Sequence, residues 1–104
     1  MESAVIITTA PWDYHRDELN AVCNELISRG INCRLMDYEE NEALKLLLKY
    51  GIKDGMVRIP SVFIIHGDRV IQVTYEVRDD LTTNIRERIM NELSRVGGHE
   101  EKAF

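Results

Sequence analysis

The first half of the chain alternates between strand-like and helix-like patterns of apolar residues. Residues 3–9 form a short, β-branched run bounded by Pro11, which predicts a buried strand. The next apolar positions recur as one face of a helix requires; they are Leu19, Val22, Cys23, Leu26 and Ile27. Asp13 or Asp17 is expected to cap this helix, which should end near Arg29, before Gly30. Residues 31–38 then alternate apolar and polar side chains and predict a half-buried strand.

The second half continues with one helix, two strands and a last helix. Residues 41–50 read as a helix closed by Gly51, and residues 59–65 as a strongly buried strand. Residues 66–68 are typical of a hairpin turn, after which residues 69–77 should pair back. Asp79 or Asp80 is expected to cap the last helix, whose apolar residues fall four apart; they are Leu81, Ile85, Ile89 and Leu93.

These elements predict an α/β fold with the order β-α-β-α-β-β-α. Right-handed crossovers make the first two strands parallel, and the hairpin adds an antiparallel pair. The expected architecture is therefore a four-stranded mixed sheet with helices on both faces. We expect residues 1–96 to form a single domain and residues 97–104 to be a flexible C-terminal tail.

Composition narrows the classes of partner and site. The 104 residues carry a net charge of −5, which argues against nucleic acid as the partner, because affinity for phosphate backbones comes from Lys and Arg. No apolar run has the length of a membrane span, and the first residues do not resemble a signal peptide, so we expect a cytoplasmic protein without membrane contact. The two cysteines and three histidines do not have the paired spacings of a structural metal site, so we expect no metal.

The segments "LLLKYGI…VRIPSVFI", "HGDRVI" and "EVRDDL" together resemble the thioredoxin superfamily, and its glutaredoxin branch most closely. "LLLKYGI…VRIPSVFI" is similar to the family's helix, Gly and cis-proline strand, with Pro60 in the place of the cis-proline. "HGDRVI" resembles its hairpin, and "EVRDDL" lies where the family has Gly-Gly-x-Asp-Asp-Leu. The resemblance covers about residues 3–96 and implies a thioredoxin-like fold. The longer link from Gly51 to Pro60 resembles viral glutaredoxins.

The family's CxxC motif is missing from this chain. "TAPWDYHR" runs alongside the family's Thr-Lys-Pro-Gly-Cys-Pro-Tyr-Cys, so that Asp13 and Arg16 take the positions of the two cysteines. A helix N-terminus favours an anion, and the carboxylate of Asp13 satisfies that preference. A carboxylate does not exchange with disulfides. The resemblance therefore implies a redox-inactive member of the fold.

Cys23 and Cys33 lie outside the loop and are expected to be buried thiols that pack as small hydrophobic side chains. A disulfide between them is geometrically feasible, but a cytosolic setting disfavours it. An oxidoreductase that uses either cysteine in an unusual way stays open as an alternative function.

The family's glutathione pocket is largely replaced. Ala10 and His15 stand where the family has Lys and Tyr, and Glu76 and Val77 replace the two glycines. Only Pro60, Asp79 and Asp80 remain, the last two as residual glutathione-type contacts. The resemblance thus implies weak or no glutathione binding, and we expect no cofactor.

The remaining candidate is a surface that binds a protein or peptide. It consists of Pro11, Trp12, Asp13, Tyr14, His15 and Arg16 from the loop and Arg58, Ile59 and Pro60 from the cis-proline segment. Trp and Tyr are enriched at binding hot spots. Three alternatives stay open: Trp12 packs down on the domain, Asp13 and His15 form a catalytic dyad, or the chain is a purely structural subunit with contacts on its helices.

Overall fold

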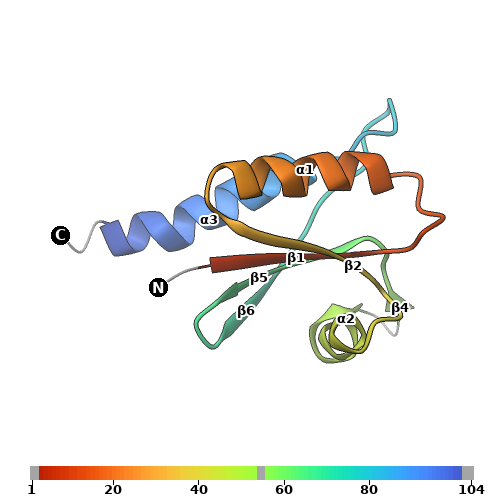
Figure 1. The fold of residues 1–104 in the computed structure, drawn as a ribbon, viewed down its shortest axis with the longest axis horizontal. Helices are drawn as coiled ribbons and strands as arrows, with labels where there is room; N and C mark the ends of the chain where they lie inside the picture. Colours follow the sequence, from red (N-terminus) through yellow and green to blue (C-terminus); the bar gives the residue numbers. More distant parts are fainter. Residues whose placement is uncertain (1–2, 54–55, 102–104) are drawn as a thin grey trace.

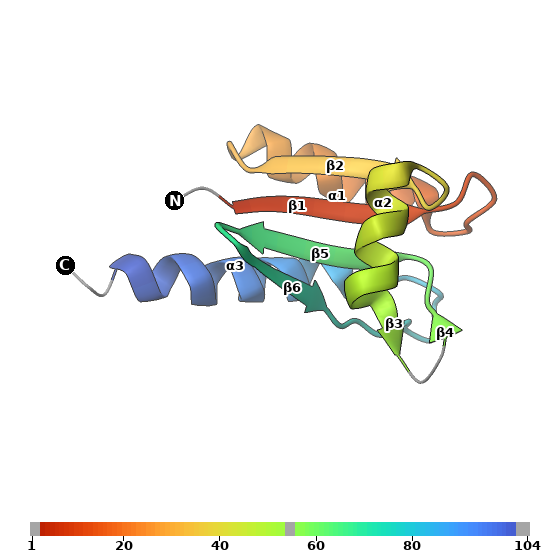
Figure 2. The ribbon, with the colours of Figure 1, turned by 90° about the horizontal axis from the view of Figure 1, so that it is seen from below.

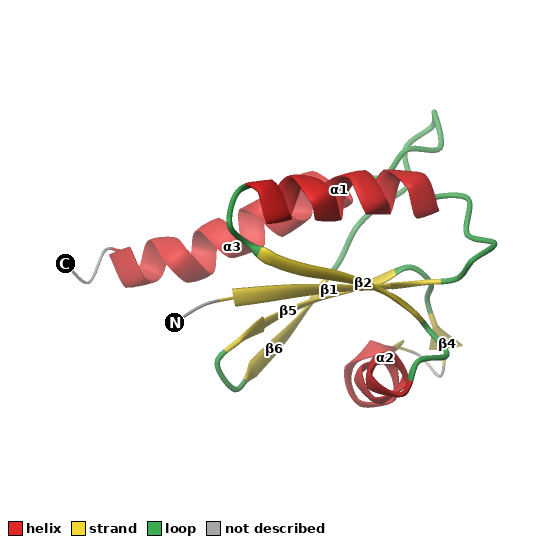
Figure 3. Cartoon of the chain, viewed as in Figure 1, coloured by secondary structure: helices red, strands yellow, loops and turns green. Residues whose placement is uncertain are grey.

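The computed structural model describes residues 3–53 and 56–101, which form one sheet with helices on both faces (Figures 1 and 3). The elements are β1 (Ser3–Thr9), α1 (Arg16–Ser28), β2 (Asn32–Asp37), α2 (Asn41–Leu46), η1 (Leu47–Gly51), β3 (Ile52–Lys53), β4 (Met56–Val57), β5 (Ser61–His66), β6 (Arg69–Val73) and α3 (Ile85–Glu101). The element η1 is a π-helical turn that continues α2.

The sheet has the strand order β2-β1-β5-β6. β1 is parallel to β2 and antiparallel to β5, and β5 and β6 form an antiparallel hairpin. α1 and α3 cover one face of this sheet, and α2 covers the other (Figure 1). The predicted α/β class and four-stranded mixed sheet are confirmed, and the arrangement is compatible with a thioredoxin-like fold.

The larger core lies between the sheet and the two helices α1 and α3. Val5, Ile7, Val62 and Ile64 from the central strands are fully buried there. The predicted apolar face of α1 is also buried, except for Ile27, which is 54% exposed. A smaller cluster lies under α2 and consists of Ile6, Met36 and Ala43 with the partly buried Leu46 and Ile65. Apolar side chains on both faces of β1 explain why its sequence does not alternate.

The link between α2 and β5 contains structure that the sequence pattern did not predict. The helix expected over residues 41–50 changes into the π-helical turn η1 before Gly51. Gly51 is buried, and a Cβ atom added there would lie 3.1 Å from Cδ2 of Leu47. The short antiparallel pair β3–β4 then fills the longer connection to Pro60 (Figure 2).

The last helix begins later than expected. α3 starts at Ile85, so Asp79 and Asp80 do not cap it, and Thr83 Oγ1 accepts the N–H of Ile85 instead. Leu81 lies in the preceding loop with a φ of 70°, outside the helix to which it was assigned. α3 also continues to Glu101, through much of the segment expected to be a tail. Residues 102–104 lie outside the described residues.

The expectation that Cys23 and Cys33 are free packing thiols is wrong, because the two residues form a disulfide. Their Cα atoms lie 5.4 Å apart, and the bond joins α1 to β2. The pattern was correct about burial, since Cys23 is 4% and Cys33 6% exposed. Both residues had been placed on faces that meet in the core, and that shared location permits the bond.

Candidate functional site

The loop between β1 and α1 projects from the end of the sheet (Figures 1 and 2). Trp12 and Tyr14 are each 75% exposed, so the alternative in which Trp12 packs down on the domain is wrong. The turn beneath them is held by the backbone: Asp13 N–H donates to Ala10 O at 3.0 Å, and Arg16 N–H donates to Asp13 O at 3.2 Å. The two aromatic rings are thus presented by a hydrogen-bonded turn.

Asp13 points inward, with a side chain only 8% exposed. The Thr9 hydroxyl donates to its Oδ2 at 2.6 Å, and the backbone N–H of His15 donates to its Oδ1 at 2.9 Å. Charge-assisted bonds of this kind stabilise a carboxylate that has little contact with water. The N-cap of α1 is nevertheless His15, and neither Asp13 nor Asp17 holds that position. Asp13 therefore organises the turn before the helix and does not cap the helix itself.

His15 connects the loop to the segment after β6. Its Nε2 lies 2.8 Å from the Leu81 carbonyl oxygen, and because a carbonyl only accepts, Nε2 is the donor. Nδ1 lies 3.5 Å from Oδ1 of Asp13, and the ring packs edge-on against Tyr14 at 5.3 Å between centroids. The Asp13–His15 pair is thus close together, but its Nε2 atom is bound to the protein's own backbone and does not face a substrate.

Arg16 lies in the first turn of α1 and is used for structure. Its guanidinium lies 3.0 Å from Oδ1 of Asp37, at the end of β2. Asp13 and Arg16, which the sequence analysis aligned with the cysteines of the glutaredoxin motif, therefore both hold side chains engaged with partners inside the domain.

The Arg58–Pro60 segment lies at the same end of the sheet as the loop, because Thr8 pairs with Ser61 across β1 and β5. The Ile59–Pro60 peptide bond is cis. The Ser61 hydroxyl donates to the Arg58 carbonyl, and the Thr8 hydroxyl donates to the Ser61 carbonyl at 3.2 Å. Pro60 is buried, Ile59 is partly buried and Arg58 is exposed. The segment is thereby fixed against the end of β1.

Tyr75 is a site residue that the sequence analysis missed. Its hydroxyl donates to the Pro60 carbonyl at 2.7 Å, and the Arg58 guanidinium stands 4.4 Å from its ring centre. Burial raises the pKa of Tyr75 above its ordinary value of 10.0; the Asp13 charge adds to this, and Arg58 opposes it. The phenol therefore stays neutral and keeps its donor. Tyr75 falls inside the strand expected over residues 69–77, whereas β6 ends at Val73. An aromatic residue in an expected strand does not indicate this contact.

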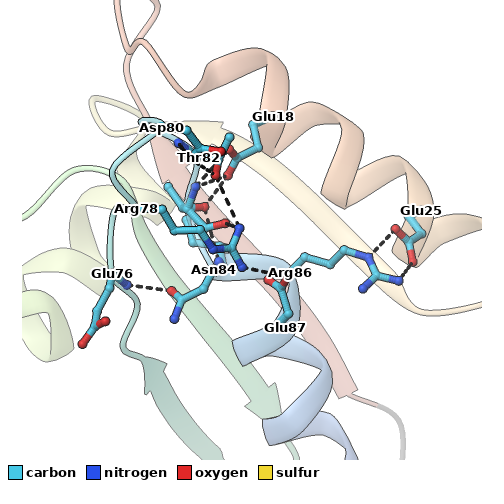
Figure 4. A network of polar contacts seen from close by, with 11 residues as sticks. Glu18, Glu25, Glu76, Arg78, Asp80, Thr82, Asn84, Arg86 and Glu87 are labelled. Atoms are coloured by element: carbon cyan, nitrogen blue, oxygen red, sulfur yellow. Dashed lines mark hydrogen bonds and ion pairs between the residues drawn. The ribbon is translucent and has the colours of Figure 1, made fainter.

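The segment from residue 76 to residue 84 is tied to α1 and α3 by polar side chains (Figure 4). Thr83 donates its N–H and its hydroxyl to the carboxylate of Glu18 on α1. Arg78 pairs with Glu87 at 2.9 Å, and Asn84 Oδ1 accepts the N–H of Glu76 at 2.6 Å. These contacts position the loop whose carbonyl His15 holds.

The two candidate glutathione-type carboxylates have ordinary surroundings. Asp80 accepts the N–H and the hydroxyl of Thr82, and the hydroxyl bond is the main cause that lowers the pKa of Asp80 below 3.8. Asp79 is exposed. Asp80 is thus part of a local turn.

The cysteines do not contribute a reactive group to this surface. Cys23 lies on α1 about two turns after Arg16, in the core with Val5 and Ile7. There is no free cysteine among the described residues, and the disulfide is buried on both sides. A thiolate must reach a sulfur atom to attack a disulfide, and the packing around both cysteines prevents that access.

No protein-family model matches the chain, and a search of curated proteins finds no match to it. Within residues 3–53 and 56–101, none of the helices is long and apolar enough to cross a bilayer. In the same residues, no group of three His, Cys, Asp or Glu side chains is placed to hold a metal ion.

Proposed function

We propose that this chain is a redox-inactive, glutaredoxin-like member of the thioredoxin superfamily that binds a protein or peptide. The binding surface, called here the docking surface, consists of residues 11–16 and residues 58–60. Support comes from the order of the elements, the four-stranded sheet and the meeting of these two segments at one end of it. Asp13 and Arg16 take the place of the catalytic cysteines.

The observation that carries the proposal is the exposure of Trp12 and Tyr14 on an ordered turn. Two large aromatic side chains left in water do not contribute the stabilisation that apolar side chains gain when they are buried in the core. Aromatic side chains have few rotatable bonds, so anchors on an ordered turn lose little conformational freedom when they bind. A protein partner that covers both rings is therefore favoured over a partner on the helices.

An oxidoreductase with unusual cysteine use is the second candidate, and the Cys23–Cys33 disulfide is the feature that favours it. It would require a substrate thiol to reach sulfur atoms in the core. We expect no turnover in a glutathione-coupled disulfide reduction assay, and weak or no glutathione binding. Turnover that a Cys23→Ala/Cys33→Ala variant abolishes would replace the first proposal with this one.

Selection from a library of random 12-residue peptides, followed by titration of synthetic peptides, tests the docking surface directly. We expect selected peptides to lose at least about thirtyfold in affinity for a Trp12→Ala/Tyr14→Ala variant, since hot-spot aromatics contribute about 2 kcal/mol or more. Ile27→Ala is the matched control, because this exposed apolar residue lies near the other end of α1. Equal loss in the control, or no loss in the test variant, would contradict the proposal.

The cytoplasmic location stays a prediction, as do the absence of a nucleic-acid partner and of membrane contact. The Cys23–Cys33 disulfide is the feature that argues against a cytosolic location, since cytosolic thiol systems keep most protein cysteines reduced. Rapid alkylation of native cells with a thiol reagent, followed by intact-mass analysis, would show whether the two cysteines are free where the protein resides.

A further inference from the structure

Arg58 lies at the docking surface against an aromatic ring. Its guanidinium lies 4.4 Å from the centre of the Tyr75 ring, and that ring is buried and anchored through its hydroxyl to the Pro60 carbonyl. A guanidinium over an aromatic ring is attracted to the ring electrostatically and keeps its charge. The side chain is also exposed to solvent. Arg58 therefore presents its positive charge at the docking surface.

The charge of Arg58 lacks a carboxylate partner, unlike that of most arginines on the described surface. The paired arginines are Arg16 with Asp37, Arg29 and Arg86 with Glu25, Arg34 with Glu42, Arg78 with Glu87 and Arg95 with Glu92. No carboxylate of the described residues lies within ion-pair distance of Arg58, although the chain carries a net charge of −5. A cation that is held against a ring and lacks a carboxylate partner, in an acidic protein, is suited to an external anion.

We propose that the docking surface takes an acidic peptide segment whose Asp or Glu carboxylate binds Arg58 while a neighbouring apolar side chain packs on Trp12 or Tyr14. This inference rests on the proposed function and adds the chemical class of the partner. The carboxylate matches the planar donor edge of one guanidinium, which can bind both of its oxygens.

A carboxylate fits this position better than a phosphate group. Recognition of phosphorylated motifs generally uses clusters of arginines, and Arg58 is a single one here. The nearby carboxylate of Asp13 is turned inward, where it accepts from Thr9 and His15, so it does not occupy the guanidinium.

The test uses peptides selected on the parent protein from the random 12-residue library. We expect Asp and Glu to be enriched among them, and each synthetic peptide to bind about tenfold more weakly to Arg58→Gln, which corresponds to about 1.4 kcal/mol for a charge-assisted bond. Replacing the peptide's acidic residue by its amide should give a similar loss on the parent and almost no loss on Arg58→Gln. Affinity for the parent should also fall more steeply with NaCl than affinity for the variant.

Arg69→Gln provides a control with the same change of charge. Arg69 is exposed at the start of β6, and its pairing with His66 places it at the opposite end of the sheet. We expect less than a twofold change in affinity there.

Peptides that depend on Trp12 and Tyr14 but show no acidic preference and no loss on Arg58→Gln would overturn this inference alone. An equal loss on Arg58→Gln and Arg69→Gln would reduce the effect to net charge and overturn it as well. A library that gives no peptide dependent on Trp12 and Tyr14 would overturn both this inference and the proposed function.

Discussion

The disulfide between Cys23 and Cys33 gives a stability prediction that follows from the length of the loop it closes. The two residues are 10 apart in sequence, so the bond closes a loop of about 11 residues in the unfolded chain. The chain-entropy relation for such a loop gives about 3 kcal/mol of stabilisation. For a domain of about 100 residues this corresponds to a decrease in Tm of roughly 10 to 20 °C when the bond is lost.

Urea unfolding of the parent and of a Cys23→Ala/Cys33→Ala variant, each with and without a dithiol reductant, measures this contribution. We expect the reductant to destabilise the parent by about 3 kcal/mol and to leave the variant unchanged. The variant should be less stable than the reduced parent, because its alanines also remove buried sulfur atoms from the core. The oxidised parent should have the smallest m-value, since its unfolded state is more compact.

Two results would refute this reasoning. If the oxidised and reduced parent unfold at the same urea concentration, the bond does not constrain the unfolded chain as described. If intact-mass analysis of the untreated protein shows two alkylatable thiols, the bond is not formed in solution, and the original expectation of packing thiols would be restored.

Three further predictions concern the loop, the ion pairs and the backbone. An Asp13→Cys/Arg16→Cys variant should gain glutathione-coupled disulfide reductase turnover, because the donors around Asp13 would stabilise a thiolate. The Arg16→Cys variant is the inactive control. A double variant that folds but shows no turnover would contradict the alignment of the loop. Arg86→Gln should destabilise the protein at pH 7, and the difference from the parent should shrink as pH falls below 4.5. The hydrogen bond from Arg86 is the main cause that lowers the pKa of Glu25 below 4.5. The pair therefore stabilises the folded protein above pH 4.5, and this stabilisation is lost as Glu25 becomes protonated at lower pH. If urea unfolding gives the same difference in stability between parent and variant at every pH, this reasoning is refuted. Leu81→Gly should raise the free energy of unfolding by roughly 0.5 to 1 kcal/mol, because glycine tolerates the φ of 70° and the leucine side chain is exposed. If urea unfolding shows a less stable variant, the leucine side chain packs against the protein in solution.

Hydrophobic periodicity was sufficient to predict the main elements of the sheet and its two covering layers. Residues 3–9 coincide with β1, and the expected helical face of α1 is the face that enters the core. Burial drives both the pattern and the structure, which is why these predictions hold. The short pair β3–β4 has too few residues to produce a period, so the pattern could not indicate it.

The start of α3 shows how a local signal can be misread. Asp79 and Asp80 precede an apolar residue that lies four positions before Ile85, so they resemble caps. In the structure Leu81 has a left-handed backbone conformation, and its carbonyl accepts from His15, 66 residues earlier in the chain. That contact depends on tertiary structure, and sequence spacing carries no information about it.

The same distinction separates the two halves of the candidate site. The exposure of Trp12 and Tyr14 could be anticipated because a loop between a buried strand and a helix runs over the surface. The role of Arg58 could not, because it depends on Tyr75 being placed beneath it by the β5–β6 hairpin and anchored to Pro60. The unpaired charge follows from that placement, since a guanidinium held over a ring is less free to reach the carboxylates nearby. In the proposed function, the aromatic residues therefore mark where the partner binds, and Arg58 determines which charge that partner carries.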